Sequence, residues 1–190
     1  MEKTNRNHLQ RATQFRAAEE NGDRYIEGYF AVFDDIYDMG YGMTESIDRH
    51  AFDKTIHDDV RVLVNHDTTL VLGRTSAGTA ELRVDDHGLW GRVKINPNDT
   101  DAMNAWARAQ RGDVDQASFG FDIISEERKN GNGTVHWTLM EVRLYEVSLC
   151  TFPAYESTSL SARADERRNG ERRKFEAWKA KKQEEFDKWH

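Results

Sequence analysis

Three side chains in this sequence carry the chemistry of a hydrolytic triad, and they occur in the order His66, Ser118 and Glu146. A free serine is a poor nucleophile because its hydroxyl proton must leave as the oxygen attacks. A neutral imidazole can accept that proton, and a buried carboxylate can fix the imidazole tautomer and stabilise the imidazolium. The three residue types therefore indicate nucleophilic catalysis, with Ser118 as nucleophile, His66 as base and Glu146 as the orienting carboxylate.

Ser118 lies in a segment, residues 116–124, that alternates between apolar and polar positions as a half-buried strand does. Gly120 falls two residues later on the same face, and a glycine there would leave open space above the serine hydroxyl. We therefore expect a substrate to approach over this face and assign substrate contacts to Phe119 and Gly120. The alternative is an ordinary strand with a small polar residue on its wetter face.

His66 and Glu146 each extend an apolar series on a predicted strand. His66 follows Val60, Val62 and Val64 at alternating positions, and Glu146 follows Met140, Val142 and Leu144 in the same way. Both also have a structural interpretation. A histidine on an apolar face can be a hydrogen-bonded core residue, and a buried carboxylate can pair with an arginine such as Arg74 or Arg143.

Other kinds of site are not indicated. The histidines show no metal-ligand spacing and no phosphate-binding loop is present, so neither a metal nor a cofactor is expected. Cys150 could act as a nucleophile with His66, although a buried structural cysteine is the simpler interpretation. No Gly-x-Ser-x-Gly motif surrounds Ser118, which argues against an α/β-hydrolase.

Charge and composition argue against nucleic-acid or membrane partners. The chain of 190 residues has a net charge of −7, and its last 28 residues, 163–190, hold ten basic and seven acidic residues. The preceding part is therefore strongly acidic, whereas nucleic-acid binding needs concentrated positive charge. No apolar run is long enough for a membrane span and no signal peptide is visible. A single cysteine fits a reducing compartment.

Turn signals and periodicity predict a mainly β protein with some helices. Asn21-Gly22 joins two predicted strands, at 9–18 and 24–34, into a hairpin. Helical segments are expected at 50–57 and 101–111, the second capped by residues 98–100 and ended by Gly112. Eight or nine short strands with hairpin turns favour a closed or nearly closed antiparallel β-barrel flanked by helices.

The composition changes near Ser161, which predicts a barrel domain at 1–160 and a charged helical tail at 161–190. Phe-x-x-Trp occurs twice in the tail, eleven residues apart, so its aromatic residues return to one face of a long helix. This stripe needs a partner, which is either the chain's own domain or a second copy in a homo-oligomer.

The order of these motifs resembles the prohead (capsid maturation) protease family of tailed phages, distant relatives of herpesvirus assemblin. The resemblance covers roughly residues 10–160 and is carried by five segments: Glu27-Gly28-Tyr29-Phe30-Ala31-Val32-Phe33, Glu45-Ser46-Ile47 with Ala51-Phe52, Asn65-His66-Asp67 with Leu72-Gly73, Ala117-Ser118-Phe119-Gly120-Phe121, and Glu146-Val147-Ser148-Leu149-Cys150-Thr151-Phe152-Pro153-Ala154.

This resemblance implies a serine endopeptidase with an assemblin-like barrel, in which His66 and Ser118 take the positions of the family's histidine and serine. The third member varies among relatives, and Glu146 occupies its position here. Family members act in the host cytoplasm inside the immature prohead, where they cut scaffolding segments from capsid proteins and often themselves. Alternatives are a non-enzymatic capsid-assembly protein that binds shell subunits through its tail, and a general esterase.

The resemblance does not fix the groups that would stabilise an oxyanion. The backbone N–H groups of residues 118–120 and of the loop after Thr151 are candidates, with Arg74 or Arg143 as assisting side chains.

Overall fold

The computed structural model describes residues 7–11, 15–131 and 133–151, and this part of the chain is built mainly from β-strands. The elements, in chain order, are β1 (Asn7–Arg11), β2 (Arg16–Glu20), β3 (Asp23–Val32), β4 (Tyr37–Gly40), β5 (Met43–Ile47), β6 (Arg61–Val64), β7 (Asp67–Arg74), the 3-10 helix η1 (Thr75–Ala77), β8 (Ala80–Val84), β9 (Gly88–Lys94), α1 (Thr100–Arg111), β10 (Gln116–Gly131) and β11 (Thr134–Cys150).

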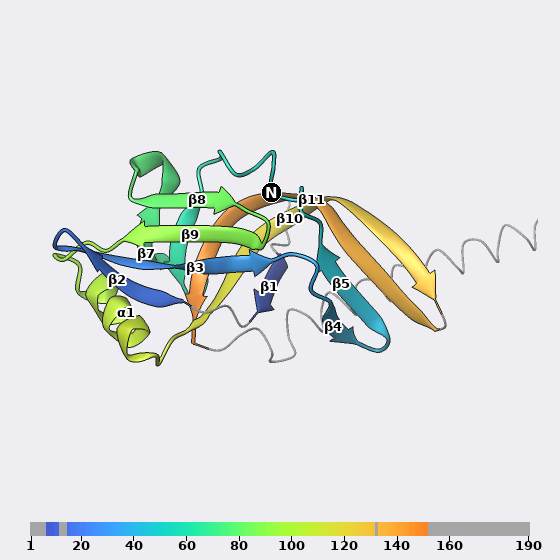
Figure 1. Ribbon diagram of the computed structural model, residues 1–190, viewed down its shortest axis with the longest axis horizontal. Helices are drawn as coiled ribbons and strands as arrows, with labels where there is room; N and C mark the ends of the chain where they lie inside the picture. Colours follow the sequence, from blue (N-terminus) through green and yellow to red (C-terminus); the bar gives the residue numbers. More distant parts are fainter. Residues whose placement is uncertain (1–6, 12–14, 132, 152–190) are drawn as a thin grey trace, which may run out of the picture.

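The strands form two separate sheets, and the long β10–β11 hairpin belongs to the larger one (Figure 1). The smaller sheet has four strands in the order β2-β3-β9-β8. The larger has seven strands: β1-β10-β11-β5-β4, with β6 also on β11 and β7 on β6. β1 runs antiparallel along β10 with Gln10 opposite Ser118. The strand that carries Ser118 is therefore paired on both edges, by β1 and by β11.

The prediction of a closed or nearly closed barrel is wrong for the described part of the chain, where both sheets are open. The reason lies along one edge of β11, which is divided between two separate strands. β5 pairs with residues 135–139 and β6 pairs with residues 146–149. Between them the edge meets a non-strand segment, since Val142 donates to the Ala51 carbonyl at 3.0 Å and Leu144 donates to Thr55 Oγ1 at 2.9 Å. The sheet therefore branches instead of closing.

The helical predictions have different outcomes. Residues 50–57 form a run of turns and not a helix, because most of the backbone bonds in this segment join residues three apart, as from Ala51 to Asp48 at 3.0 Å. The predicted helix at 101–111 is confirmed as α1, with Asp99 accepting from two N–H groups of its first turn and Gly112 ending it at a φ of 81°. The long helix predicted at 161–190 lies outside the described residues, as does the boundary at 160.

α1 packs against β2 and β3 through its small apolar face. Among the residues that the structure describes, no helix has the length and apolar character that a membrane crossing requires.

One face of the β10–β11 hairpin is part of the hydrophobic core. Phe119 stacks on Phe121 with ring centroids 4.8 Å apart and meets Phe52 edge-on at 5.5 Å. Val147 and Leu149 lie opposite this row on β11 and are fully buried. This apolar face fixes the register of the hairpin, since a one-residue slip would move every side chain to the other face.

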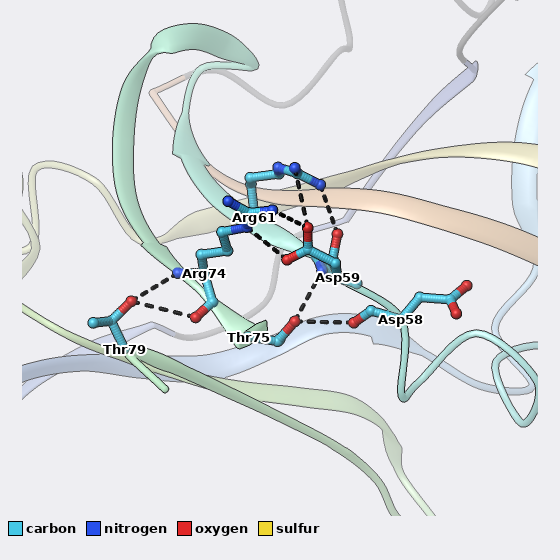
Figure 2. A network of polar contacts seen from close by, with 7 residues as sticks. Asp58, Asp59, Arg61, Arg74, Thr75 and Thr79 are labelled. Carbon is cyan, nitrogen blue, oxygen red and sulfur yellow. Dashed lines mark hydrogen bonds and ion pairs between the residues drawn. The ribbon is translucent and has the colours of Figure 1, made fainter. Parts of the chain in front are cut away.

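The base of the β6–β7 hairpin is held by charged groups (Figure 2). Arg61 and Arg74 lie opposite each other where the hairpin begins and ends, and both bind Asp59. Arg74 Nε donates to Oδ1 of Asp59 at 2.7 Å and its terminal nitrogen contacts Oδ2, while Arg61 lies 3.1 Å from Oδ2. Thr75 Oγ1 adds a bond to the Val60 N–H at 2.9 Å. The two ends of the hairpin are therefore tied together.

The hydrogen bond from Arg74 holds the pKa of Asp59 well below its usual value of 3.8. A carboxyl whose pKa is lowered by folding stabilises the native state above its unfolded pKa, and this contribution is lost as the pH falls through the folded pKa. We therefore expect Asp59→Asn to lower the thermal unfolding midpoint above pH about 4. The difference from wild type should fade in stronger acid. A midpoint that is unchanged at pH 7 would show that the network does not hold the hairpin.

Candidate active site

The structure brings His66 and Glu146 into direct contact. His66 Nδ1 lies 2.7 Å from Glu146 Oε1, and the two side chains are only 19% and 6% exposed. An ionised carboxylate can only accept, so the hydrogen bond requires the proton to sit on Nδ1 of the neutral ring. Nε2 is then left with its lone pair, which is the protonation state that a general base needs.

His66 sits in a tight turn and not on the valine face that the sequence predicted. β6 ends at Val64, and Asn65 and His66 form a two-residue connection to β7, with φ values of 50° and 59°. Positive φ at both positions is the requirement of a type I′ turn, whose second residue is usually glycine. This turn swings the imidazole away from the valine face toward Glu146.

The turn is also fastened to the end of β11. The Asn65 N–H donates to the Leu149 carbonyl at 2.7 Å, and the Asn65 side chain accepts from the Thr151 N–H at 2.9 Å. The His66 N–H donates to Ser148 Oγ at 3.1 Å. The position of the imidazole is therefore set by β11, the strand that also carries its carboxylate partner.

A β-bulge aims Glu146 at this turn. Leu144 pairs with Phe121 and Glu146 pairs with Gly120, so Tyr145 is an extra residue on β11 with no counterpart on β10. The bulge reverses the alternation: Leu144 faces the core, whereas Glu146 lies on the opposite face with Gly120 and Ser118. The prediction that Glu146 shares a face with Leu144 is therefore wrong. Bulges commonly re-aim a side chain in this way beside active sites.

Ser118 lies on the same face of the hairpin as Glu146. It is directly opposite Ser148, two residues along β11 from Glu146, and it has 0% exposed surface. The Ser118 hydroxyl is therefore not accessible from solvent in this structure.

The space above Gly120 differs from the expected open surface. A Cβ atom built on Gly120 would lie 2.3 Å from Glu146 Oε1, so the carboxylate itself occupies that space. Gly120 is thus required for the approach of Glu146 to its strand. Phe119 faces the core on the other side of the strand. The assignment of substrate contacts to Phe119 and Gly120 stays a prediction, and only their backbone could make them.

Two further side chains of β11 meet the pair, and the sequence reasoning overlooked one of them. Ser148 Oγ donates to Glu146 Oε2 at 2.6 Å and is completely buried. The sequence contained a signal for Ser148, because it lies two residues after Glu146 and residues two apart on a strand share a face. Cys150 follows on the same face, with Sγ 3.7 Å from His66 Nε2. Its thiol is buried and lies next to the basic nitrogen.

A cleft of about 370 Å³ opens beside the carboxylate. It is lined by residues of the β6–β7 hairpin and of β11: Arg61, Leu63, Thr68, Val71, Tyr145 and Glu146. Val71 is 44% exposed, which gives the cleft an apolar rim. Next to His66, hydrogen bonds from the hydroxyl and N–H of Thr69 lower the pKa of Asp67. The Asp67 carboxylate is therefore already hydrogen-bonded within β7.

Arg74, one of the two arginines considered for the site, is engaged elsewhere. Arg74 binds Asp59 at the base of the hairpin, at the opposite end from His66. It is therefore neither the partner of Glu146 nor placed to assist an oxyanion. The loop that follows Thr151 lies outside the described residues. In the described residues no group of three or more histidine, cysteine or acidic side chains is placed to hold a metal ion.

A contact between a histidine ring and a serine hydroxyl occurs between β5 and β11. The ring of His136 lies between Thr44 Oγ1, at 2.8 Å from Nδ1, and Ser46 Oγ, at 2.9 Å from Nε2. Neither of these partners is a carboxylate. Without a carboxylate to hold the tautomer and stabilise the charged ring, His136 is a weaker candidate for a base. It serves as a natural comparison for His66.

The left-handed backbone at His66 should affect the stability of the protein. In this conformation a residue with a Cβ is destabilised by roughly 1–2 kcal/mol, whereas glycine is not. Both His66→Gly and His66→Ala remove the imidazole. The difference between their free energies of unfolding therefore reports the effect of the backbone conformation alone. We expect the glycine variant to be more stable by about 1 kcal/mol in denaturant unfolding. At His87, whose φ is not positive, the same two substitutions should give the usual order with alanine more stable. An alanine advantage at position 66 would contradict the turn geometry.

Comparisons with known proteins give a sequence relative and a solved structure. The prohead protease of Enterobacteria phage HK97 is 26% identical over 155 residues, which are 79% of this chain and 64% of that protein. The chain thus spans less than two thirds of the length of this relative. The solved structure of the bacteriophage T4 capsid assembly protease, gp21, matches with a TM-score of 0.49 and 13% identity, covering 79% of this chain and 100% of that one.

The family profile gives the most extensive match, since the profile of the caudovirus prohead serine proteases covers residues 11–173. That span includes the β6–β7 turn, the Ser118 strand and the bulged end of β11. The chain therefore belongs to the caudovirus prohead serine protease family.

Proposed function

We propose that this protein is a serine endopeptidase that cleaves scaffolding segments from capsid proteins, and then itself, during maturation of a phage prohead. The observation that carries this proposal is the 2.7 Å contact between His66 and Glu146, on the strand face that also holds Ser118. Membership of the prohead protease family supports the same reaction. The site of action would be the interior of the immature capsid in the host cell.

In the proposed mechanism the site opens to the substrate, with Ser118 Oγ within hydrogen-bond reach of His66 Nε2. The imidazole accepts the hydroxyl proton as the oxygen attacks the scissile carbonyl. Glu146 stabilises the resulting imidazolium through Nδ1 without taking its proton. The ring then returns the proton to the leaving amine, and a water molecule hydrolyses the acyl-enzyme by the same route.

Co-expression with the major capsid protein of the same phage tests this function. Wild-type protein should shorten the capsid protein by a defined N- or C-terminal segment, read as a change in intact mass. Ser118→Ala should leave the capsid protein at full length while retaining the wild-type unfolding midpoint. Full-length capsid protein with both forms would contradict the proposal, and equal shortening by both would exclude Ser118.

Gly120 provides a test of the carboxylate position. A methyl group at this position would lie 2.3 Å from Glu146 Oε1, and the carboxylate can yield because it ends a flexible side chain. We expect Gly120→Ala to fold but to lose about 10²-fold or more in cleavage rate, since displacement of a catalytic group by about 1 Å has that effect.

Gly131 is a matched control on the same strand, because a Cβ there meets nothing within 4 Å. Gly131→Ala should cleave at the wild-type rate. If Gly120→Ala also remained fully active, the observed position of Glu146 would not be the one used in the reaction.

A further inference from the structure

Ser148 makes two hydrogen bonds that join the backbone of the histidine turn to the carboxylate. Its Oγ accepts from the His66 N–H at 3.1 Å and donates to Glu146 Oε2 at 2.6 Å. A serine hydroxyl has one proton and two lone pairs, so both its proton and an acceptor position are engaged. The residue is fully buried, which makes both bonds strong and costly to lose.

We propose that Ser148 is a positioning residue for the His66–Glu146 pair, an inference that rests on the proposed endopeptidase function. The structure supports this role in two ways. The bond to Oε2 fixes the rotation of the carboxylate, which directs Oε1 at Nδ1. The bond from the His66 N–H holds the turn residue that carries the imidazole in its left-handed backbone conformation.

Both hydrogen bonds of Ser148 affect the distance between His66 Nδ1 and Glu146 Oε1. The ring is carried by the β6–β7 turn and the carboxylate by β11, so their 2.7 Å contact depends on the alignment of two separate elements. Ser148 touches both elements through a single atom. Its own strand position is fixed in turn by pairing with Ser118 on β10 and with Leu63 on β6. The hydroxyl thus locks the base to its carboxylate within a rigid part of the sheet.

The same contacts distinguish this role from that of a nucleophile. The proton of Ser148 is directed at the carboxylate, and its oxygen faces the backbone N–H of His66. Neither bond involves Nε2, the nitrogen that would activate a nucleophilic hydroxyl. Loss of Ser148 should therefore slow the reaction by misaligning the base, and should not remove the residue that becomes acylated.

A fluorophosphonate probe tests the role without knowledge of the cleavage sequence. Ser148→Ala should lower the maximal rate of labelling at Ser118 by about 10- to 100-fold, the loss expected for a hydrogen bond to a charged group. The concentration for half-maximal labelling should be unchanged. Ser148→Thr keeps the hydroxyl and should recover most of the rate.

Ser46→Ala is the matched control, since Ser46 is also a strand serine bonded to a histidine, in its case through the ring of His136. It should label at the wild-type rate. Unfolding midpoints of all variants separate misalignment from loss of fold. In addition, the downfield ¹H resonance of His66 Nδ1–H, identified by its absence in His66→Ala, should be visible in wild type and broadened or shifted in Ser148→Ala.

The outcomes separate this inference from the proposed function. If Ser148→Ala labels at the wild-type rate with an unchanged Nδ1–H resonance, the positioning role is overturned and the endopeptidase proposal stands. If the probe becomes attached to Ser148, this residue is the nucleophile and the role is likewise overturned. If wild-type protein neither labels nor cleaves capsid protein, the proposed function itself fails.

Discussion

Ser118→Ala and His66→Ala should each reduce the rate of capsid-protein cleavage by on the order of 10⁶-fold, which places both near the limit of detection. The serine supplies the attacking oxygen and the imidazole removes its proton, so neither works without the other. The double variant should therefore be no slower than either single variant. Rates of product formation from purified capsid protein, followed by mass spectrometry, would measure all three.

His136→Ala is the control for the histidine, because His136 also contacts a serine hydroxyl but has two hydroxyl partners and no orienting carboxylate in those contacts. It should cleave at close to the wild-type rate. If the losses in Ser118→Ala and His66→Ala multiplied in the double variant, the two residues would act independently and the proposed unit would be wrong.

Glu146→Gln should cost about 10⁴-fold in the maximal cleavage rate, less than loss of the serine or the histidine. The amide keeps the size of the side chain but can present an N–H to Nδ1 of His66. That contact favours the tautomer with its proton on Nε2, which cannot accept the Ser118 proton. The amide also removes the negative charge that stabilises the imidazolium.

Glu141→Gln is the matched control, since Glu141 lies on the same strand and binds Lys54 away from the site. It should leave the cleavage rate unchanged. Cleavage by Glu146→Gln at the wild-type rate would exclude Glu146 from the catalytic group, and the contact with His66 would then be structural.

The sequence predicted the elements with a strong local signal. Asn21-Gly22 gives the β2–β3 turn, with φ values of 52° and 85° that match the type I′ geometry expected of this pair. Asp99 and Gly112 mark the ends of α1. In each case the residues that determine the structure lie within a few positions of the element itself.

Alternation placed Ser118 on the correct face of β10, but it could not predict the positions of Glu146 and His66. A single extra residue, Tyr145, reverses the side of the sheet to which Glu146 points. Similarly, ending β6 at Val64 moves His66 from a strand into a turn, although histidine is an unusual choice for that turn position. Both irregularities depend on pairing with distant strands, and both occur at residues of the candidate site.

The prediction of a closed barrel was wrong for a related reason. Short strands joined by hairpins are compatible with both open and closed sheets, and the local pattern does not say which edges pair. Here β5 and β6 pair with different parts of the same edge of β11, a division that no local signal indicates. Ser148, by contrast, could have been found from the sequence, because its spacing from Glu146 places both on one face.

The most direct test of the central claim is to identify the residue that a fluorophosphonate phosphonylates in a wild-type preparation that cleaves capsid protein. After reaction with a fluorophosphonate probe, tandem mass spectrometry of the digested protein would locate the adduct among Ser118, Ser148 and Cys150. Our account predicts a single adduct on Ser118 that is lost in His66→Ala. An adduct on Ser148 or Cys150, or undiminished labelling of Ser118 without His66, would contradict it.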